Sequence, residues 1–221
     1  MAMGSLSKRV DEVRIGPSKL PGLLGLVDEP KGIVLFAHGS GSGRFSPRNN
    51  FVASGLREAG LATLLLDLLQ PEEEDNRSKV FDIELLASRL QEASLWSRQH
   101  APTAQLPIGY FGASTGAAAA LVAAARLGTE IAAIVSRGGR PDLAGAMLEQ
   151  VQAPTLLIVG SLDAAVLDLN RQALEHIPAH KQLSIVPGAT HLFEEPGTLN
   201  QVLTLAANWF IQHLPGKYSG R

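Results

Sequence analysis

Three residues that lie far apart in the chain have the types needed for nucleophilic chemistry. Ser114 is the centre of GASTG (residues 112–116), a G-x-S-x-G pattern between an apolar run and an alanine-rich one. Asp163 follows the apolar run TLLIVG, and His191 lies further on, in GATHLF. A serine hydroxyl is a weak nucleophile at neutral pH and needs a neighbouring base that a third group orients. Together the three residues predict the nucleophile, acid and base of one catalytic triad.

Each of these residues also has a plainer interpretation. A serine before a helix can be an N-cap with glycines that only pack, and an aspartate beside Gly and Ser often forms a turn. Asp168 is a second candidate for the acid, whereas Asp67 could serve only with a different loop geometry. His191 is favoured as the base because it alone among the six histidines follows the last predicted strand and precedes the last predicted helix.

The candidate residues belong to a chain in which two kinds of segment alternate. Short, almost continuously apolar runs, typical of parallel strands buried on both faces, alternate with longer amphipathic segments. The predicted strands are residues 32–39, 61–69, 106–114, 131–139, 153–161 and 181–189, and the predicted helices are residues 47–59, 78–99, 115–127, 143–151, 166–177 and 198–214. Residues 12–16 and 20–27 predict an antiparallel pair of strands ahead of them.

This alternation predicts an α/β fold with a doubly wound, mostly parallel sheet between two layers of helices. Ligands of such sheets bind beyond the carboxyl ends of the strands, which is where the three candidate residues fall. A serine at a sharp strand-to-helix turn needs glycines on both sides, because side chains there would collide. The following backbone N–H then points to where an oxyanion would form. The position of GASTG between strand and helix therefore favours Ser114 as a nucleophile.

Four segments, LFAHGSGSG, GYFGASTG, LLIVGSLD and GATHLF, resemble those of the α/β-hydrolase superfamily. Within it, the chain is similar over about residues 12–214 to the small, capless dienelactone-hydrolase-like branch. The resemblance implies the triad Ser114, Asp163 and His191, and an oxyanion hole formed by the backbone N–H groups of Ser40 and Thr115. The hydrolases that name this branch use a cysteine nucleophile, whereas this chain has no cysteine. That departure favours a serine esterase over a dienelactone hydrolase.

The glycine-rich loop at residues 38–50, HGSGSGRFSPRNN, lets the backbone approach a substrate closely. A phosphate-binding loop is the alternative, but the P-loop pattern ends in G-K-[ST], which does not occur here. The family resemblance assigns His38 a structural role in holding this loop. Arg44 in the loop and Arg137 after a predicted strand are candidates for binding a substrate carboxylate. Pairing of both arginines with local acids or carbonyls is the other interpretation.

The amino-acid composition excludes several classes of function. A net charge of −2 lacks the basic footprint of a nucleic-acid-binding protein. The absence of cysteine excludes disulfides, thiolate catalysis and Cys-ligated metal, and no run approaches the roughly 20 apolar residues that span a bilayer. We expect one cytoplasmic domain over residues 1–221, monomeric or homodimeric, with residues 1–10 a frayed or appended end. No metal or organic cofactor and no membrane or nucleic-acid partner is expected.

The sequence predicts a serine hydrolase that cleaves carboxylic esters, with a small-molecule ester as its partner and short-chain or lactone-like substrates. The short connection after Arg137 leaves no room for a cap domain, so the site is expected to be open. An acyltransferase or perhydrolase on the same triad is one alternative, with another nucleophile in place of water. A hydrolase fold used only for binding, with a vestigial triad, is the other.

Overall fold

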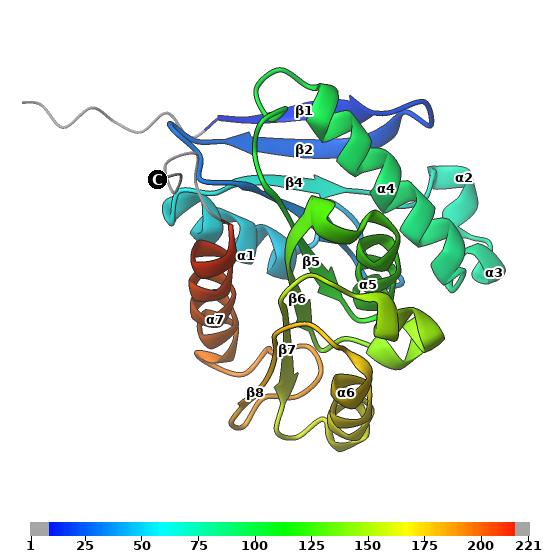
Figure 1. The fold of residues 1–221 in the computed structure, drawn as a ribbon, viewed down its shortest axis with the longest axis vertical. Helices are drawn as coiled ribbons and strands as arrows, with labels where there is room; N and C mark the ends of the chain where they lie inside the picture. Colours follow the sequence, from blue (N-terminus) through cyan, green and yellow to red (C-terminus); the bar gives the residue numbers. More distant parts are fainter. Residues whose placement is uncertain (1–8, 215–221) are drawn as a thin grey trace, which may run out of the picture.

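The fold is built around one eight-stranded sheet in the computed structural model, which describes residues 9–214 (Figure 1). The strands run in the order β1-β2-β4-β3-β5-β6-β7-β8, and the antiparallel β1 and β2 form one end of an otherwise parallel sheet. Their bounds are β1 Arg9–Ile15, β2 Leu20–Leu26, β3 Ile33–Ala37, β4 Ala62–Leu66, β5 Ile108–Ala113, β6 Ile131–Arg137, β7 Thr155–Gly160 and β8 Lys181–Val186.

Helices cover both faces of the sheet (Figure 1). On one face lie α1 Pro47–Glu58 and α7 Thr198–His213, which contact each other. On the other lie α4 Ile83–Gln99, α5 Thr115–Leu127 and α6 Ala164–His176, together with the short helices α2 Pro71–Glu74 and α3 Arg77–Val80. Two 3-10 segments, η1 Gly128–Glu130 and η2 Pro141–Gln150, flank β6. The predicted α/β fold with a mostly parallel sheet is confirmed.

Two predicted helices differ from the structure. The helix expected over residues 78–99 is interrupted, because Asp82 caps a new helix through its side chain, which accepts a hydrogen bond from the Leu85 N–H at 3.0 Å. The helix expected over residues 143–151 is a 3-10 segment broken at Gly145, whose φ of 52° lies in the left-handed region. Residues 1–8 of the predicted frayed end lie outside the described part of the chain, whereas Arg9 and Val10 belong to β1.

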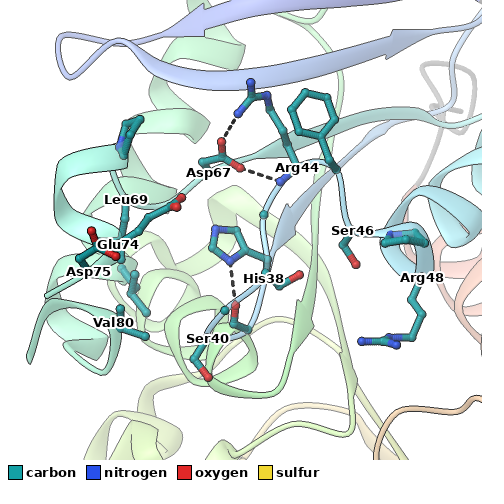
Figure 2. Close-up of a pocket in the computed structure, with 18 residues that line it drawn as sticks. His38, Ser40, Arg44, Ser46, Arg48, Asp67, Leu69, Glu74, Asp75 and Val80 are labelled. Atoms are coloured by element: carbon teal, nitrogen blue, oxygen red, sulfur yellow. Dashed lines mark hydrogen bonds and ion pairs between the residues drawn. The ribbon is translucent and has the colours of Figure 1, made fainter. Parts of the chain in front are cut away.

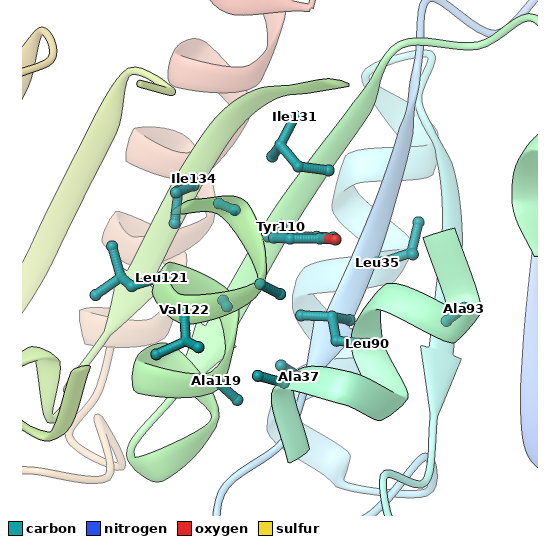
Figure 3. Packing of buried hydrophobic residues seen from close by; sticks show 14 of the residues in the cluster. Leu35, Ala37, Leu90, Ala93, Tyr110, Ala119, Leu121, Val122, Ile131 and Ile134 are labelled. Atoms are coloured by element: carbon teal, nitrogen blue, oxygen red, sulfur yellow. The ribbon is translucent and has the colours of Figure 1, made fainter. Parts of the chain in front are cut away.

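The alanine-rich helix α5 is buried along almost its whole length. Every residue from Thr115 to Ala125 is buried, and the helix packs against β5 and α4 (Figure 3). Small side chains let its backbone approach the sheet closely, while larger residues such as Tyr110 and Leu90 fill the space around it. The tight packing holds the N-terminus of α5, where Ser114 lies, in one position.

Candidate active site

Ser114 occupies a strained turn between β5 and α5. Its φ of 51° and ψ of −123° lie outside the regions that residues other than glycine ordinarily adopt. The Ser114 N–H donates to the Arg137 carbonyl at 3.4 Å, and the Ser114 carbonyl accepts from the Arg140 N–H at 3.1 Å. These bonds hold the strained serine to the end of β6 and to the residues that follow it. The Ser114 hydroxyl makes no helix-capping hydrogen bond, so the N-cap role open to a serine at this position is not used.

Three glycines make room for this turn. A Cβ on Gly116 would lie closer than 3.0 Å to the carbonyl oxygens of Ala37 and His38, so a larger residue there requires the backbone of β3 to shift. A Cβ on Gly112 would meet the helix backbone at Ala117 equally closely. At Gly39 it would lie 3.7 Å from the Ser114 Oγ, so the glycine-rich loop passes directly beside this hydroxyl. The glycines of GASTG therefore serve close backbone approach.

Asp163 and His191 are hydrogen-bonded to each other. The His191 Nδ1 and the Asp163 Oδ2 are 2.6 Å apart, a short hydrogen bond to a charged acceptor. Asp163 lies after β7 as the N-cap residue of α6, and His191 lies in the loop between β8 and α7. The bond to the carboxylate directs hydrogen to Nδ1 and leaves Nε2 as the free basic nitrogen.

The loop that carries His191 lies against the segment that holds Ser114. A Cβ on Gly138 would lie 3.1 Å from the His191 carbonyl oxygen and 3.6 Å from its ring Cε1. Because the neighbouring Arg137 carbonyl accepts the Ser114 N–H, one short segment contacts both residues. Within the loop, the Thr190 hydroxyl donates to Glu195 at 2.6 Å, which lowers the pKa of that carboxyl and helps to fix the loop.

The other sequence candidates for acid and base lie in different surroundings. The Asp168 side chain is 67% exposed and pairs with Arg171 at 3.0 Å, within helix α6. His180 packs against Trp209 and His213 at the opposite end of β8 from His191. The described residues contain no group of three or more His, Cys, Asp or Glu side chains placed to hold a metal ion.

His38 anchors the glycine-rich loop. Its ring Nδ1 donates to the Gly39 carbonyl at 2.9 Å, and its Nε2 accepts from the Leu68 N–H at 3.0 Å. This pattern requires the neutral imidazole, and burial lowers the pKa of His38, which favours that form. The Ser40 N–H, at the next turn of the loop, donates to the Thr115 Oγ1 at 3.2 Å. The loop and the start of α5 are thus directly connected.

Arg44 is held by Asp67, as Figure 2 shows. The Asp67 carboxylate accepts from the Arg44 N–H at 2.6 Å and also pairs with its guanidinium. The guanidinium carbon lies 4.2 Å from the centre of the Phe45 ring. Asp67, which the sequence offered as an alternative acid, therefore neutralises Arg44 and shapes the loop.

Arg137 is buried, and part of its guanidinium group has no hydrogen-bond acceptor in the described part of the chain. Its side chain extends from the end of β6 toward Phe193, with the guanidinium carbon 5.9 Å from that ring. The Nε and Nη1 atoms have no hydrogen-bond partner among residues 9–214, and Arg137 is only 8% exposed. Burial, and secondarily the positive charge of Arg48, lowers the pKa of Arg137 to about 10, so it remains charged at neutral pH. Arg48 pairs with Glu194 at 2.8 Å.

A cavity of about 760 Å³ adjoins the glycine-rich loop (Figure 2). Its walls are residues 38–48 together with the region of α2 and α3, and they carry both Arg48 and the acids Glu74 and Asp75. The cavity shares Gly39 with the surroundings of Ser114, whereas Ser114, Asp163 and His191 do not line it. The sequence did not single out the side chains of Arg48 or Thr115. Thr115 occupies a variable position of the G-x-S-x-G motif, and the contacts of both side chains depend on residues distant in the chain.

No family model matches the chain, but known proteins do. A crystal structure of dienelactone hydrolase from Anabaena variabilis is 53% identical, with a TM-score of 0.89 over 94% of this chain and 98% of that one. Est1E from Butyrivibrio proteoclasticus has a TM-score of 0.75 at 14% identity over 93% of this chain and 98% of that one. The Pyrococcus furiosus esterase Pf2001 has a TM-score of 0.73 at 16% identity over 94% of each chain. The latter two show the fold alone.

The chain belongs to the dienelactone-hydrolase-like branch of the α/β-hydrolases. Two proteins of Mycobacterium tuberculosis strains, both provisionally named phosphoribosyl transferase, are 61% identical over 210 residues. These residues make up 94% of this chain and 47% of each relative. The chain therefore spans about half the length of the curated relatives that it matches. No helix within residues 9–214 is long and apolar enough to cross a membrane.

Proposed function

We propose that the protein is a serine hydrolase that cleaves carboxylic esters through Ser114, His191 and Asp163. The observation that carries this proposal is the 2.6 Å bond between His191 and Asp163, in a fold whose nucleophile turn carries a strained serine. The similarity to a dienelactone hydrolase, at 53% identity, supports hydrolysis as the general reaction. With no cysteine in the chain, the nucleophile that this turn can present is a hydroxyl.

In the proposed mechanism, the Ser114 Oγ attacks the ester carbonyl carbon while the His191 Nε2 takes its proton. Asp163 holds the imidazole by its Nδ1–H and stabilises the imidazolium that forms. The carbonyl oxygen becomes an oxyanion at the N-terminus of α5, where the Thr115 N–H and the positive end of the helix dipole favour negative charge. The imidazolium returns the proton to the leaving alkoxide, and water then releases the acid from the acyl-enzyme by the reverse sequence.

An acidic group on the substrate fits Arg137 better than Arg44. Arg44 already has its counter-ion in Asp67, whereas Arg137 is buried with two guanidinium nitrogens that have no acceptor among residues 9–214. A buried donor without a partner costs about 1–3 kcal/mol, which a substrate carboxylate would relieve. We therefore propose a preference for small anionic esters or lactones.

The reaction is tested with p-nitrophenyl acetate and a fluorophosphonate probe on wild type and Ser114→Ala. We expect turnover and labelling at Ser114, both lost in the variant, because no other group replaces the hydroxyl. Ser88→Ala is the matched control, since Ser88 is exposed on α4 and donates only to the Leu85 carbonyl. Absence of both turnover and labelling in the wild type would favour a binding module. Wild-type labelling without hydrolysis, but with acyl transfer to added alcohol or peroxide, would favour the acyltransferase or perhydrolase.

The anionic preference is tested with Arg137→Met, which keeps much of the side-chain volume and removes the charge. We expect kcat/KM for a carboxylate-bearing ester to fall about 10- to 100-fold relative to a neutral ester, the worth of a hydrogen bond to a charged group. Arg171→Met on exposed α6 is the control for loss of one positive charge. Unchanged selectivity in Arg137→Met would remove this residue from substrate binding.

The name of the mycobacterial relatives does not change this proposal. The matched half corresponds to an α/β-hydrolase chain, at 53% identity to dienelactone hydrolase over nearly its full length. We infer that any phosphoribosyl transfer by those relatives belongs to the half that this chain does not match. Expression of the two halves of a relative as separate proteins, each assayed for ester hydrolysis and phosphoribosyl transfer, tests this assignment. Phosphoribosyl transfer by the matched half would overturn it.

A further inference from the structure

The Thr115 side chain lies between the two backbone donors that the family resemblance assigns to the oxyanion hole. Its own N–H is one of them, and its Oγ1 lies 3.2 Å from the nitrogen of the other, Ser40. Thr115 is the first residue of α5, directly after Ser114, and is only 5% exposed. The hydroxyl therefore belongs to the residue next to the nucleophile in the chain and is largely shielded from water.

The hydrogen bonds available to the Ser40 N–H and the Thr115 hydroxyl can be counted. The Ser40 backbone has a single N–H hydrogen, and it is directed to the Thr115 Oγ1. A threonine hydroxyl accepts through two lone pairs and donates one hydrogen of its own. The only hydrogen bond recorded for this hydroxyl among residues 9–214 is the one it accepts from Ser40, so its hydrogen is free to donate. An acceptor at the oxyanion position would use that hydrogen.

The geometry that joins loop and helix is rigid. Gly116 brings the first turn of α5 so close to Ala37 and His38 that an added Cβ would overlap their carbonyl oxygens. His38 ties the same loop to the Leu68 N–H at 3.0 Å. The bond from Ser40 to Thr115 is thus made between two fixed elements, and a preorganised donor is the kind that stabilises a transition state.

We propose that the Thr115 hydroxyl is a donor of the oxyanion hole beside the Thr115 N–H, and a catalytic residue of the esterase. The Ser40 N–H, which the family resemblance assigned to the hole, then acts through this hydroxyl. The hydroxyl accepts the Ser40 N–H, which polarises it, and donates its own hydrogen to the oxyanion that forms when Ser114 attacks the ester. No proton leaves Thr115, since the hydrogen bond strengthens as charge develops and weakens when the tetrahedral intermediate collapses. This inference rests on the proposed ester hydrolysis.

The test compares Thr115→Val, which has nearly the same shape without the hydroxyl, with Thr115→Ser, which keeps the hydroxyl. Loss of one oxyanion-hole donor typically lowers kcat about 10²- to 10³-fold, so we expect Thr115→Val to lose at least about tenfold with little change in KM. Thr115→Ser should retain kcat within a few-fold. Thr204→Val is the matched control, because its hydroxyl is exposed on α7 and donates only to the Asn200 carbonyl.

A second substrate separates a donor from a structural clamp. The second substrate is the thiono ester, in which sulfur replaces the carbonyl oxygen. Sulfur is a weaker hydrogen-bond acceptor than oxygen, so the donors of the oxyanion hole contribute to the wild type's preference for the oxygen ester. We expect this oxygen-to-sulfur ratio of kcat/KM to fall in Thr115→Val and to be kept in Thr115→Ser. A Thr115→Val variant with wild-type kcat, or with reduced kcat and an unchanged ratio, would overturn the proposal.

A second variant and the activity of the wild type show which of the two proposals a negative result would overturn. If Thr115→Val does not fold by circular dichroism, Thr115→Ala removes the same hydroxyl without adding a methyl group and is read by the same criteria. A wild-type protein that neither turns over esters nor is labelled at Ser114 would overturn the proposed function and this inference with it. An active wild type with an unaffected Thr115 variant would overturn this inference alone.

Discussion

Replacement of Asp163 by asparagine tests the triad most directly. The change keeps the shape of the side chain but removes the charge that accepts the His191 Nδ1–H at 2.6 Å. An asparagine can instead donate its own N–H to Nδ1, which moves the ring hydrogen to Nε2. That nitrogen then carries a hydrogen and cannot take the Ser114 proton. Asp163→Asn should therefore fold normally and lose catalysis.

The size of the loss follows from two contributions. Unit charges about 4 Å apart at an effective dielectric constant of about 20 interact by about 4 kcal/mol, which is close to 10³-fold in rate. The wrong tautomer adds to this loss, and the two together reach about 10⁴-fold when an aspartate of such a triad becomes asparagine. The His191 side chain is 39% exposed, so water screens part of the charge interaction. We expect kcat/KM to fall between about 10³- and 10⁴-fold.

The assay measures ester hydrolysis and the rate of fluorophosphonate labelling in Asp163→Asn and Asp168→Asn. Asp168 is the matched control because it lies five residues further on, is 67% exposed and pairs with Arg171. Asp168→Asn should retain activity, and labelling at Ser114 should slow in Asp163→Asn in parallel with turnover. Near-normal activity of Asp163→Asn, above all alongside a defect in Asp168→Asn, would refute the assignment of the acid.

Two other changes probe the elements that hold the site. Gly116→Ala should destabilise the fold by about 1–3 kcal/mol in urea unfolding, because its Cβ would overlap backbone oxygens of Ala37 and His38; wild-type stability would contradict this packing. Burial lowers the pKa of His38 in the folded protein, so the unfolded chain binds a proton at this histidine more readily. The free energy of unfolding should therefore fall by up to about 1.4 kcal/mol per pH unit as the pH drops below about 6.5. His38→Gln should show a shallower decrease, and an identical slope would exclude this contribution.

Much of the fold could be predicted from local patterns. Strands such as β5 and β7 have almost continuously apolar sequences, which predict burial on both faces, and both are buried at every position. The segments between the strands have helical periodicity. The break before α4 was not predicted. The apolar stripe of the expected helix continues across Asp82, whereas the break depends on this one side chain, which caps a new helix. Gly145 interrupts the segment after β6 for a comparable local reason, its positive φ.

For the site, the sequence by itself determined the chemical types and their order along the chain: a serine between two glycines after one strand, an aspartate after another and a histidine after the last. Only the tertiary structure decided that Asp163 rather than Asp168 contacts His191 and that Asp67 neutralises Arg44. It also decided that Arg137 is buried without a counter-ion among residues 9–214. The physical reason is that a motif depends on neighbours in the chain, whereas a hydrogen bond depends on neighbours in space. The contact between Ser40 and Thr115, separated by 75 residues, exists because parallel strands bring their carboxyl ends to one edge of the sheet.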